Sequence, residues 1–206
     1  MFHRFVLPLS VCKKIKTYDL KTVSILDKKF RLCITRTQVR TSIDHIATRI
    51  NSDYKGKEIL FIAVLNGAFI FAADLMRKVK PLSRISFVKM ASYQGDTSAG
   101  IVNELIGLKD DLNDKHIILL EDIVDTGFTI SHAMTQIKAN YKPKSVAVAT
   151  LLFKPQSYRK NIPINYVGLE IPNDFVIGWG LDYNGYGRNL EDIYAVEENL
   201  INHLYF

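Results

Sequence analysis

IILLEDIVDTGFT, residues 117–129, is the stretch of sequence that decides the fold. Its apolar first half belongs to a run over 116–120 that predicts a strand buried on both faces, and its second half predicts the start of a helix. Similar units recur on either side, with strands predicted at 59–65, 85–92 and 145–153 and helices at 36–51, 68–79 and 130–141. This alternation predicts an α/β fold with a central, mostly parallel sheet flanked by helices.

Shorter apolar segments follow the last of these strands. The segments at 166–170, 175–179 and 192–196 predict β pieces with no helix between them. They favour a small antiparallel hood, formed by C-terminal and N-terminal parts of the chain beside the main sheet. No internal repeat, low-complexity tract or Gly/Ser linker interrupts the 206 residues, so we expect a single domain over 1–206.

The composition is that of a globular protein, with 48% hydrophobic and 23% charged residues. The net charge of +6 is concentrated in residues 1–50, which hold 11 Lys and Arg against 3 Asp and Glu, while the rest of the chain is slightly acidic. Binding of nucleic acid requires basic residues over a docking face, so this distribution argues against a nucleic-acid partner. We expect residues 1–26 to be a loose, basic N-terminal extension.

The cellular location is also constrained by the sequence. The longest apolar stretch, 59–73, is too short to cross a membrane and is interrupted by Asn66-Gly67. The only cysteines, Cys12 and Cys33, cannot staple a chain of this length or complete a four-ligand zinc site. We therefore expect a cytoplasmic protein with no membrane partner.

The residues that follow the strand at 116–120 carry the chemistry, because ligands of an open α/β sheet bind beyond the carboxyl ends of its strands. The acid pair Glu121 and Asp122 can accept hydrogen bonds from vicinal hydroxyls, such as those of ribose, and can favour a nearby cation. The backbone N–H groups at the helix start suit a phosphate monoester; they belong to Thr126, Gly127, Phe128 and Thr129. The pattern indicates a pocket for ribose 5-phosphate, although an acid pair before an ordinary helix N-cap would look the same.

The segment EDIVDTG resembles the phosphoribosyl pyrophosphate motif of type I phosphoribosyltransferases. Within that class, VLNGAFIFAADL (64–75) and DFVIGWGLDYNGYGRNL (174–190) resemble hypoxanthine-guanine phosphoribosyltransferases, and the resemblance extends from about residue 27 to 196. It implies the type I fold and a purine-salvage enzyme. Such an enzyme transfers phosphoribosyl from 5-phosphoribosyl 1-pyrophosphate to N9 of hypoxanthine, and of guanine, giving the nucleoside monophosphate and pyrophosphate.

The resemblance implies a catalytic role for Asp125, placed to hydrogen-bond purine N7, where a carboxylate can accept or hold a proton. It implies pyrophosphate binding by the loop Leu65, Asn66 and Gly67 and by Arg188. Some relatives carry lysine where this chain has Asn66, so backbone amides and Arg188 would take a larger share of the charge. Relatives also have a cis peptide that would fall between Leu65 and Asn66; the sequence alone does not decide it.

The purine site is implied in the same way. Lys154 matches the lysine that donates to the exocyclic O6, and Phe175 matches the aromatic residue that stacks on the purine, with Val176 supplying backbone contacts. Asp182 matches a residue that lies near the purine and ligates Mg²⁺. Ser92 and Tyr93 match the start of a lid over the reacting centre, and the polar, glycine-containing run at 93–103 is predicted to be that mobile loop.

Magnesium is expected as the cofactor, because a highly charged phosphoribosyl pyrophosphate would otherwise face a cluster of acids. The expected ligands are Glu121, Asp122 and Asp182, and Mg²⁺ needs few protein ligands because it keeps several waters. The five histidines show no zinc-binding spacing.

Two alternative functions stay open at this point. One is a xanthine-guanine phosphoribosyltransferase, since the sequence does not rank the three purines. The other is an RNA-binding regulator on the same fold, which the charge distribution disfavours. The resemblance also implies a homodimer or homotetramer, without deciding between them.

Overall fold

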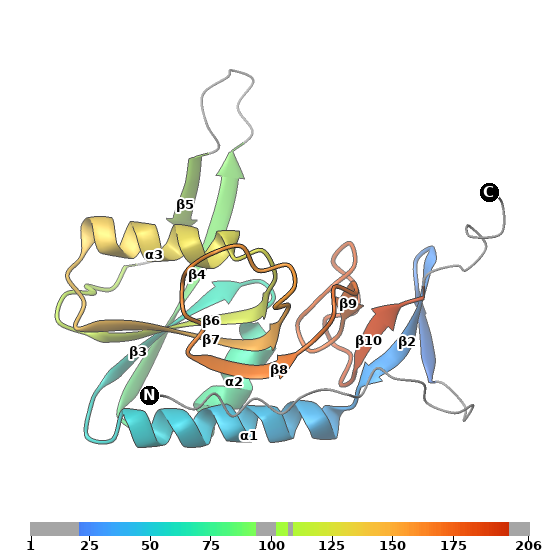
Figure 1. Ribbon diagram of the computed structural model, residues 1–206, viewed down its shortest axis with the longest axis horizontal. Coiled ribbons are helices and arrows are strands. Elements are labelled where there is room, and N and C mark those ends of the chain that lie inside the picture. Colours follow the sequence, from blue (N-terminus) through green and yellow to red (C-terminus); the bar gives the residue numbers. More distant parts are fainter. Residues whose placement is uncertain (1–20, 94–101, 107–108, 198–206) are drawn as a thin grey trace.

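The computed structural model describes residues 21–93, 102–106 and 109–197 (Figure 1). Within them, the main sheet has six strands in the order β5-β4-β3-β6-β7-β8. Their bounds are β3 Ile59–Leu65, β4 Ser83–Tyr93, β5 Val102–Ile106, β6 His116–Val124, β7 Ser145–Phe153 and β8 Tyr166–Glu170. Five strands, β4, β3, β6, β7 and β8 in spatial order, pair in parallel. β5 pairs antiparallel with β4 at one edge of the sheet. The predicted α/β fold with a mostly parallel sheet is confirmed.

The central strands are apolar on both faces because helices cover both faces (Figure 1). α1 (Arg36–Asp53) and α2 (Phe69–Met76) lie on one side of the sheet, and α3 (Phe128–Asn140) lies on the other. Side chains alternate along a strand, so the residues of β3 divide between two cores. Ile59, Phe61 and Ala63 pack in the core with α1 and α2, whereas Leu60, Ile62 and Val64 pack in the core with α3.

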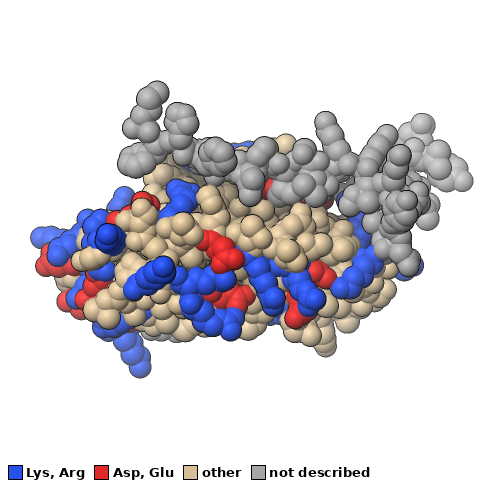
Figure 2. Space-filling view, turned by 90° about the horizontal axis from the view of Figure 1, so that it is seen from below, with Lys and Arg blue, Asp and Glu red and all other residues tan. Residues whose placement is uncertain are grey.

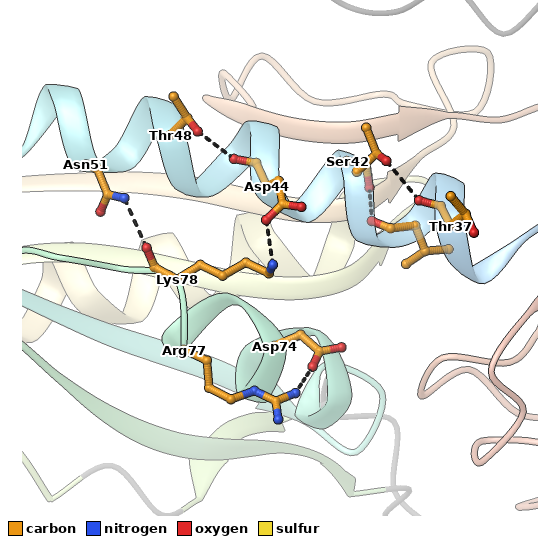
Figure 3. Close-up of polar contacts among 10 residues, drawn as sticks. Thr37, Ser42, Asp44, Thr48, Asn51, Asp74, Arg77 and Lys78 are labelled. Carbon is orange, nitrogen blue, oxygen red and sulfur yellow. Dashed lines mark hydrogen bonds and ion pairs between the residues drawn. The ribbon is translucent and has the colours of Figure 1, made fainter.

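α1 starts with the signal that the sequence carries. Thr35 and Gln38 form a capping box, in which the Thr35 backbone N–H donates to Gln38 Oε1 at 2.9 Å. Polar contacts also join α1 to the end of α2 (Figure 3). The Asn51 amide donates to the Lys78 carbonyl at 3.0 Å, and the Lys78 ammonium forms an ion pair with Asp44. These contacts fix the two helices on the same face of the sheet.

A second sheet lies beside the carboxyl edge of the main sheet (Figure 1). Its antiparallel strands are β1 Thr22–Ile25, β2 Lys28–Ile34, β10 Ile193–Val196 and β9 Val176–Ile177, in that order. The predicted hood of N-terminal and C-terminal β pieces is thus confirmed. We expected residues 1–26 to be a loose extension, but β1 lies within this segment. Residues 21–26 therefore belong to the hood.

The segment 166–170 was expected in the hood and is instead β8 of the main sheet, parallel to β7. The prediction was wrong because no helix precedes this strand, and helices were the sequence signal for a parallel crossover. Burial explains the placement: Tyr166, Val167 and Leu169 are all buried, and α1 packs against the strand.

β4 and β5 form an antiparallel hairpin, with Ser92 opposite Asn103 and Tyr93 opposite Val102. The end of the predicted lid loop at 93–103 is therefore strand, and residues 94–101 lie outside the described residues. In the part of the chain that the structure describes, no helix is long and apolar enough to cross a membrane.

Candidate active site

The site lies where β3, β6 and β7 end, at the carboxyl edge of the sheet. A pocket of about 270 Å³ opens there and is lined by the continuous segment from Glu121 to Ile130. This segment joins β6 to α3 and contains every residue that the sequence assigned to ribose and phosphate.

The helix start in this pocket is built to receive an anion. Gly127 is the N-cap residue of α3, has a φ of +84°, and no side chain caps the helix. Its carbonyl accepts the N–H of Ser131 at 2.9 Å, so the N–H groups before Ser131 have no partner within the helix. Free N–H groups and the positive end of the helix dipole favour a phosphate. A Cβ on Gly127 would lie 2.5 Å from the Tyr158 ring, so glycine is required for packing as well.

The two carboxylates ahead of this turn differ in their surroundings. Glu121 is buried, and burial together with the nearby Asp122 charge raises the pKa of Glu121 well above its usual range. Burial raises the pKa of Asp122 to about 6, although a hydrogen bond from the Ile123 N–H at 2.9 Å and the charge of Arg188 oppose this rise. Both groups lack a neutralising partner strong enough to offset burial. Hydroxyl donors or a divalent cation would supply one.

Asp125, which lines the pocket, forms an ion pair with Lys154. The Lys154 Nζ lies 3.0 Å from Asp125 Oδ2, and the Lys154 N–H donates to the carbonyl of Val124 at 2.9 Å. Lys154 is only 7% exposed, so it is not a solvated loop lysine. A donor-only ammonium and a carboxylate are thereby held side by side at the end of β6 and β7.

The loop after β3 passes directly against Asp122. The peptide between Leu65 and Asn66 is cis. A Cβ added to Gly67 would lie 1.6 Å from Asp122 Oδ2, so only glycine lets the loop come this close to the carboxylate. The carbonyl of Gly67 in turn approaches Gly180, where a Cβ would lie 2.1 Å from it. The loop therefore joins the ribose end of the site to the C-terminal segment.

That C-terminal segment places Asp182 and Arg188 together. The Arg188 guanidinium lies 2.7 Å from Asp182 Oδ1 and donates to the carbonyl of Gly180 at 2.7 Å. The other oxygen of Asp182 accepts the N–H of Gly185 at 2.7 Å. The charge of Arg188 lowers the pKa of Asp122 and that of Asp182 raises it, so the C-terminal segment lies near the Asp122 carboxyl.

Phe175 directly precedes β9 and is 45% exposed, whereas Val176, the first residue of β9, is buried. An exposed ring on a supported backbone is suited to stacking against a flat aromatic ligand. The predicted purine-binding residues thus come from three parts of the chain. Lys154 follows β7, Phe175 and Val176 lie at β9, and Asp182 lies in the loop after β9.

Comparison with known proteins identifies the family of the chain. A family model described as the phosphoribosyl transferase domain matches residues 35–184. The hypoxanthine-guanine phosphoribosyltransferase of Mycobacterium tuberculosis is 36% identical over 167 residues, which cover 78% of this chain and 82% of that protein. The chain belongs to the hypoxanthine-guanine phosphoribosyltransferases.

Other members of the family give the same picture. The hypoxanthine phosphoribosyltransferase of Escherichia coli is 34% identical over 160 residues, which cover 76% of this chain and 89% of that protein. The crystal structure of a hypoxanthine-guanine phosphoribosyltransferase from Bacillus anthracis superposes with a TM-score of 0.73 at 34% identity, covering 81% of this chain and 96% of that one. The type I phosphoribosyltransferase fold is thereby confirmed.

Sequence reasoning missed two groups near the site of this phosphoribosyltransferase. Lys160 lies beside the start of α3, where its Nζ is 4.2 Å from the centre of the Phe128 ring. Phe128 is 70% exposed. Tyr183 and Asp27 form a hydrogen bond behind Phe175, which is considered below. No local pattern marks either contact, because both depend on a loop or hairpin folding back from a distant part of the chain.

Ser92 and Tyr93, which the sequence assigned to the start of the lid, are the last residues of β4. Residues 94–101 of the predicted lid lie outside the described residues.

Proposed function

We propose that this enzyme transfers the phosphoribosyl group of 5-phosphoribosyl 1-pyrophosphate to N9 of hypoxanthine and of guanine. The products are inosine or guanosine monophosphate and pyrophosphate. The observation that carries the proposal is the buried Lys154 held 3.0 Å from Asp125, directly beside a pocket whose helix start can bind a 5′-phosphate. This arrangement combines recognition of a 6-oxo group with control of the N7 proton.

The reaction forms the bond between N9 and C1′ and breaks the bond between C1′ and the pyrophosphate oxygen, which leaves with the electron pair. Positive charge develops on the ribose in the transition state, and the purine gives up one proton. Asp125 is placed to accept or hold that proton at N7, and its negative charge favours the developing positive charge. Lys154 donates to O6 and cannot accept a hydrogen bond, so it opposes the 6-amino group of adenine.

The phosphate groups are bound at the two ends of the site. The uncapped N–H groups of α3 at Phe128 and Thr129 receive the 5′-phosphate, with the Thr126 and Thr129 hydroxyls as further donors. Arg188 and the backbone of the 65–67 loop receive the pyrophosphate, where the planar guanidinium can bind two oxygens at once. Closure of the β4–β5 hairpin region over the reacting centre would exclude water from it.

Magnesium fits the side chains at the site. Glu121, Asp122 and Asp182 offer the hard oxygen ligands that Mg²⁺ prefers, and burial leaves the first two short of positive charge. Among the described residues, no three His, Cys, Asp or Glu side chains are grouped closely enough to hold a metal ion by themselves. Since Mg²⁺ keeps several waters, Glu121, Asp122 and Asp182 would hold it without forming a closed protein cage, and the ion would supply positive charge against the departing pyrophosphate.

The test is direct. Purified protein incubated with Mg²⁺, 5-phosphoribosyl 1-pyrophosphate and hypoxanthine or guanine is expected to give the monophosphate, measured by chromatography. Failure to form either product would refute the proposal. Xanthine in the same assay, in competition with the other two purines, decides whether the alternative of a xanthine-guanine enzyme is correct.

The face of the molecule drawn in Figure 2 gives no support to an RNA-binding regulator on the same fold. Figure 2 shows the face of the molecule seen from below, on which Lys and Arg side chains are mixed with Asp and Glu rather than gathered in a basic patch. Tight, salt-sensitive RNA binding by the purified protein would contradict this view. We also propose that the enzyme is cytoplasmic and acts as a homodimer or homotetramer. Sedimentation of the full chain would establish the oligomeric state.

A further inference from the structure

Three aromatic rings pack together in the hood behind the purine-binding position. Phe30, from β2, is fully buried, and its ring centre lies 6.4 Å from that of Phe175 and 6.0 Å from that of Tyr183. Tyr183 meets Phe175 edge-on, with ring centres 6.0 Å apart and an angle of 83° between the planes. Edge-to-face packing of this kind fixes the orientation of a ring as well as its position.

The outer end of Tyr183 is attached to the N-terminal hairpin. Its hydroxyl donates to Asp27 Oδ1 at 2.8 Å. Asp27 lies in the two-residue turn between β1 and β2, where Ile25 pairs with Lys28. The Lys28 Nζ lies 4.7 Å from the centre of the Tyr183 ring and 5.9 Å from that of Phe175. The hydrogen bond lowers the pKa of Asp27 and raises the pKa of Tyr183.

Tyr183 also belongs to the loop that carries the polar half of the site. It directly follows Asp182, whose carboxylate binds Arg188 and the Gly185 N–H. Tyr183 and Tyr186 exchange both backbone hydrogen bonds across an Asn184-Gly185 turn, so the loop is itself a tight hairpin. Holding the Tyr183 side chain therefore holds this hairpin as one unit, including Asp182.

We propose that Tyr183 and Asp27 are positioning residues for the purine base. They act through Phe175 and Asp182 and do not touch the base. The N-terminal hairpin, which lies before the residues matched by the family model, thus forms part of the purine site although it carries no catalytic residue. A surface loop and a half-exposed ring would otherwise be ordered only when the purine binds, at a cost in affinity. This inference rests on the proposed function, because it concerns the purine of that reaction.

The test uses Tyr183→Phe, which keeps the ring and removes the hydroxyl, and Asp27→Ala, which removes the acceptor. Each variant is expected to raise KM for hypoxanthine about three- to tenfold, the range set by loss of one hydrogen bond. KM for 5-phosphoribosyl 1-pyrophosphate should change less than about twofold, since of its proposed binding groups only Arg188 belongs to the C-terminal loop and the others follow β3 and β6 of the main sheet. The double variant should be no worse than either single variant, because both remove the same bond.

Tyr166→Phe is the matched control. The Tyr166 hydroxyl also donates to an aspartate, Asp53 Oδ2, at 2.8 Å, but at the start of β8 and therefore at the opposite edge of the sheet. This variant loses the same kind of bond and should lose thermal stability without a change in KM for hypoxanthine. Thermal unfolding of all variants then separates loss of stability from loss of positioning.

The outcomes are distinct. If the wild-type enzyme converts hypoxanthine and the Tyr183→Phe and Asp27→Ala variants have unchanged KM for it, the positioning role is refuted and the proposed function stands. If KM rises equally for both substrates, or equally in Tyr166→Phe, the bond is merely structural and the proposal is again refuted. If the wild-type enzyme converts no purine, the proposed function itself has failed.

Discussion

Replacement of Lys154 by methionine should alter purine selection more than stability. Methionine fills a similar volume but has no charge and no donor. In the structure, Lys154 is 7% exposed, yet its partner Asp125 has a side chain that is 45% exposed. Water can therefore solvate the Asp125 carboxylate when the ammonium is removed, so the fold should lose no more than about 1 kcal/mol.

The catalytic effect should be larger. A hydrogen bond from a charged donor to O6 contributes about 1.5–3 kcal/mol, so kcat/KM for hypoxanthine should fall about 10- to 150-fold. Activity with adenine, whose 6-amino group cannot accept from an ammonium, should not fall, and the ratio of kcat/KM for hypoxanthine to that for adenine should narrow accordingly. The assay is product formation at varied purine concentration, with thermal unfolding measured alongside.

Lys154→Arg serves as the control, because it keeps the donor and the charge. It should preserve discrimination against adenine even where its bulk lowers the rate. An unchanged ratio of hypoxanthine to adenine activity in Lys154→Met would refute the assignment of Lys154 to O6. An equal fall with both purines would mean that Lys154 acts on Asp125 alone.

Other perturbations follow from the same geometry. Asp125→Asn should lower kcat about 100-fold or more, the usual range for a general acid–base, while KM for 5-phosphoribosyl 1-pyrophosphate changes little; normal turnover would remove Asp125 from its role. Because burial raises the pKa of Asp122 from 3.8 to about 6, the folded protein holds a proton there that the unfolded chain releases, and stability due to this group should decline as pH rises from about 4 to 6. Between about pH 4 and 6, binding of Mg²⁺ and 5-phosphoribosyl 1-pyrophosphate should strengthen as the Asp122 carboxylate forms. If calorimetric titration of Asp122→Asn shows the same dependence of affinity on pH, Asp122 is not the group responsible. Gly67→Ala, with a Cβ 1.6 Å from Asp122 Oδ2, should displace that carboxylate and cost about 1–3 kcal/mol in thermal unfolding as well as raising KM for 5-phosphoribosyl 1-pyrophosphate. Lys160→Gln should weaken binding of inosine monophosphate about three- to tenfold at low salt without changing that of inosine, which lacks the phosphate; equal effects on both ligands would rule out a contact with the phosphate.

Local sequence patterns were sufficient for the elements whose partners are adjacent in the chain. The sequence predicted a helix over 36–51 and a strand over 59–65, and both are present as α1 and the buried β3. β8 was misplaced because its parallel crossover, residues 154–165, contains no helix, so the sequence offered only a short strand to assign. Its position follows from contacts with β7 and α1, which no local pattern encodes.

The site shows the same division. The turn from Glu121 to Thr129 is continuous in sequence, so its residues and their common pocket could be predicted together. Nothing in the sequence around Lys154 predicts its burial, which depends on the chain after β7 folding against the end of β6, where the Lys154 N–H donates to the Val124 carbonyl. The bond between Asp27 and Tyr183 spans 156 residues and joins two unremarkable surface residues, which is why sequence reasoning passed over it.

The ion pairs of the site also explain how binding and chemistry are linked. Lys154 is paired with Asp125, and Arg188 with Asp182, so each cation that the substrates need is already engaged by an aspartate. In the proposed reaction, a purine O6 that accepts a hydrogen bond from Lys154 would weaken the hold of that ammonium on Asp125 and leave the carboxylate free to accept a hydrogen bond from N7. A pyrophosphate bound by Arg188 would likewise leave Asp182 with an uncompensated charge, so that Asp182 could help to hold a divalent cation. In the proposed reaction, each substrate would thus free an aspartate by taking the cation that is paired with it.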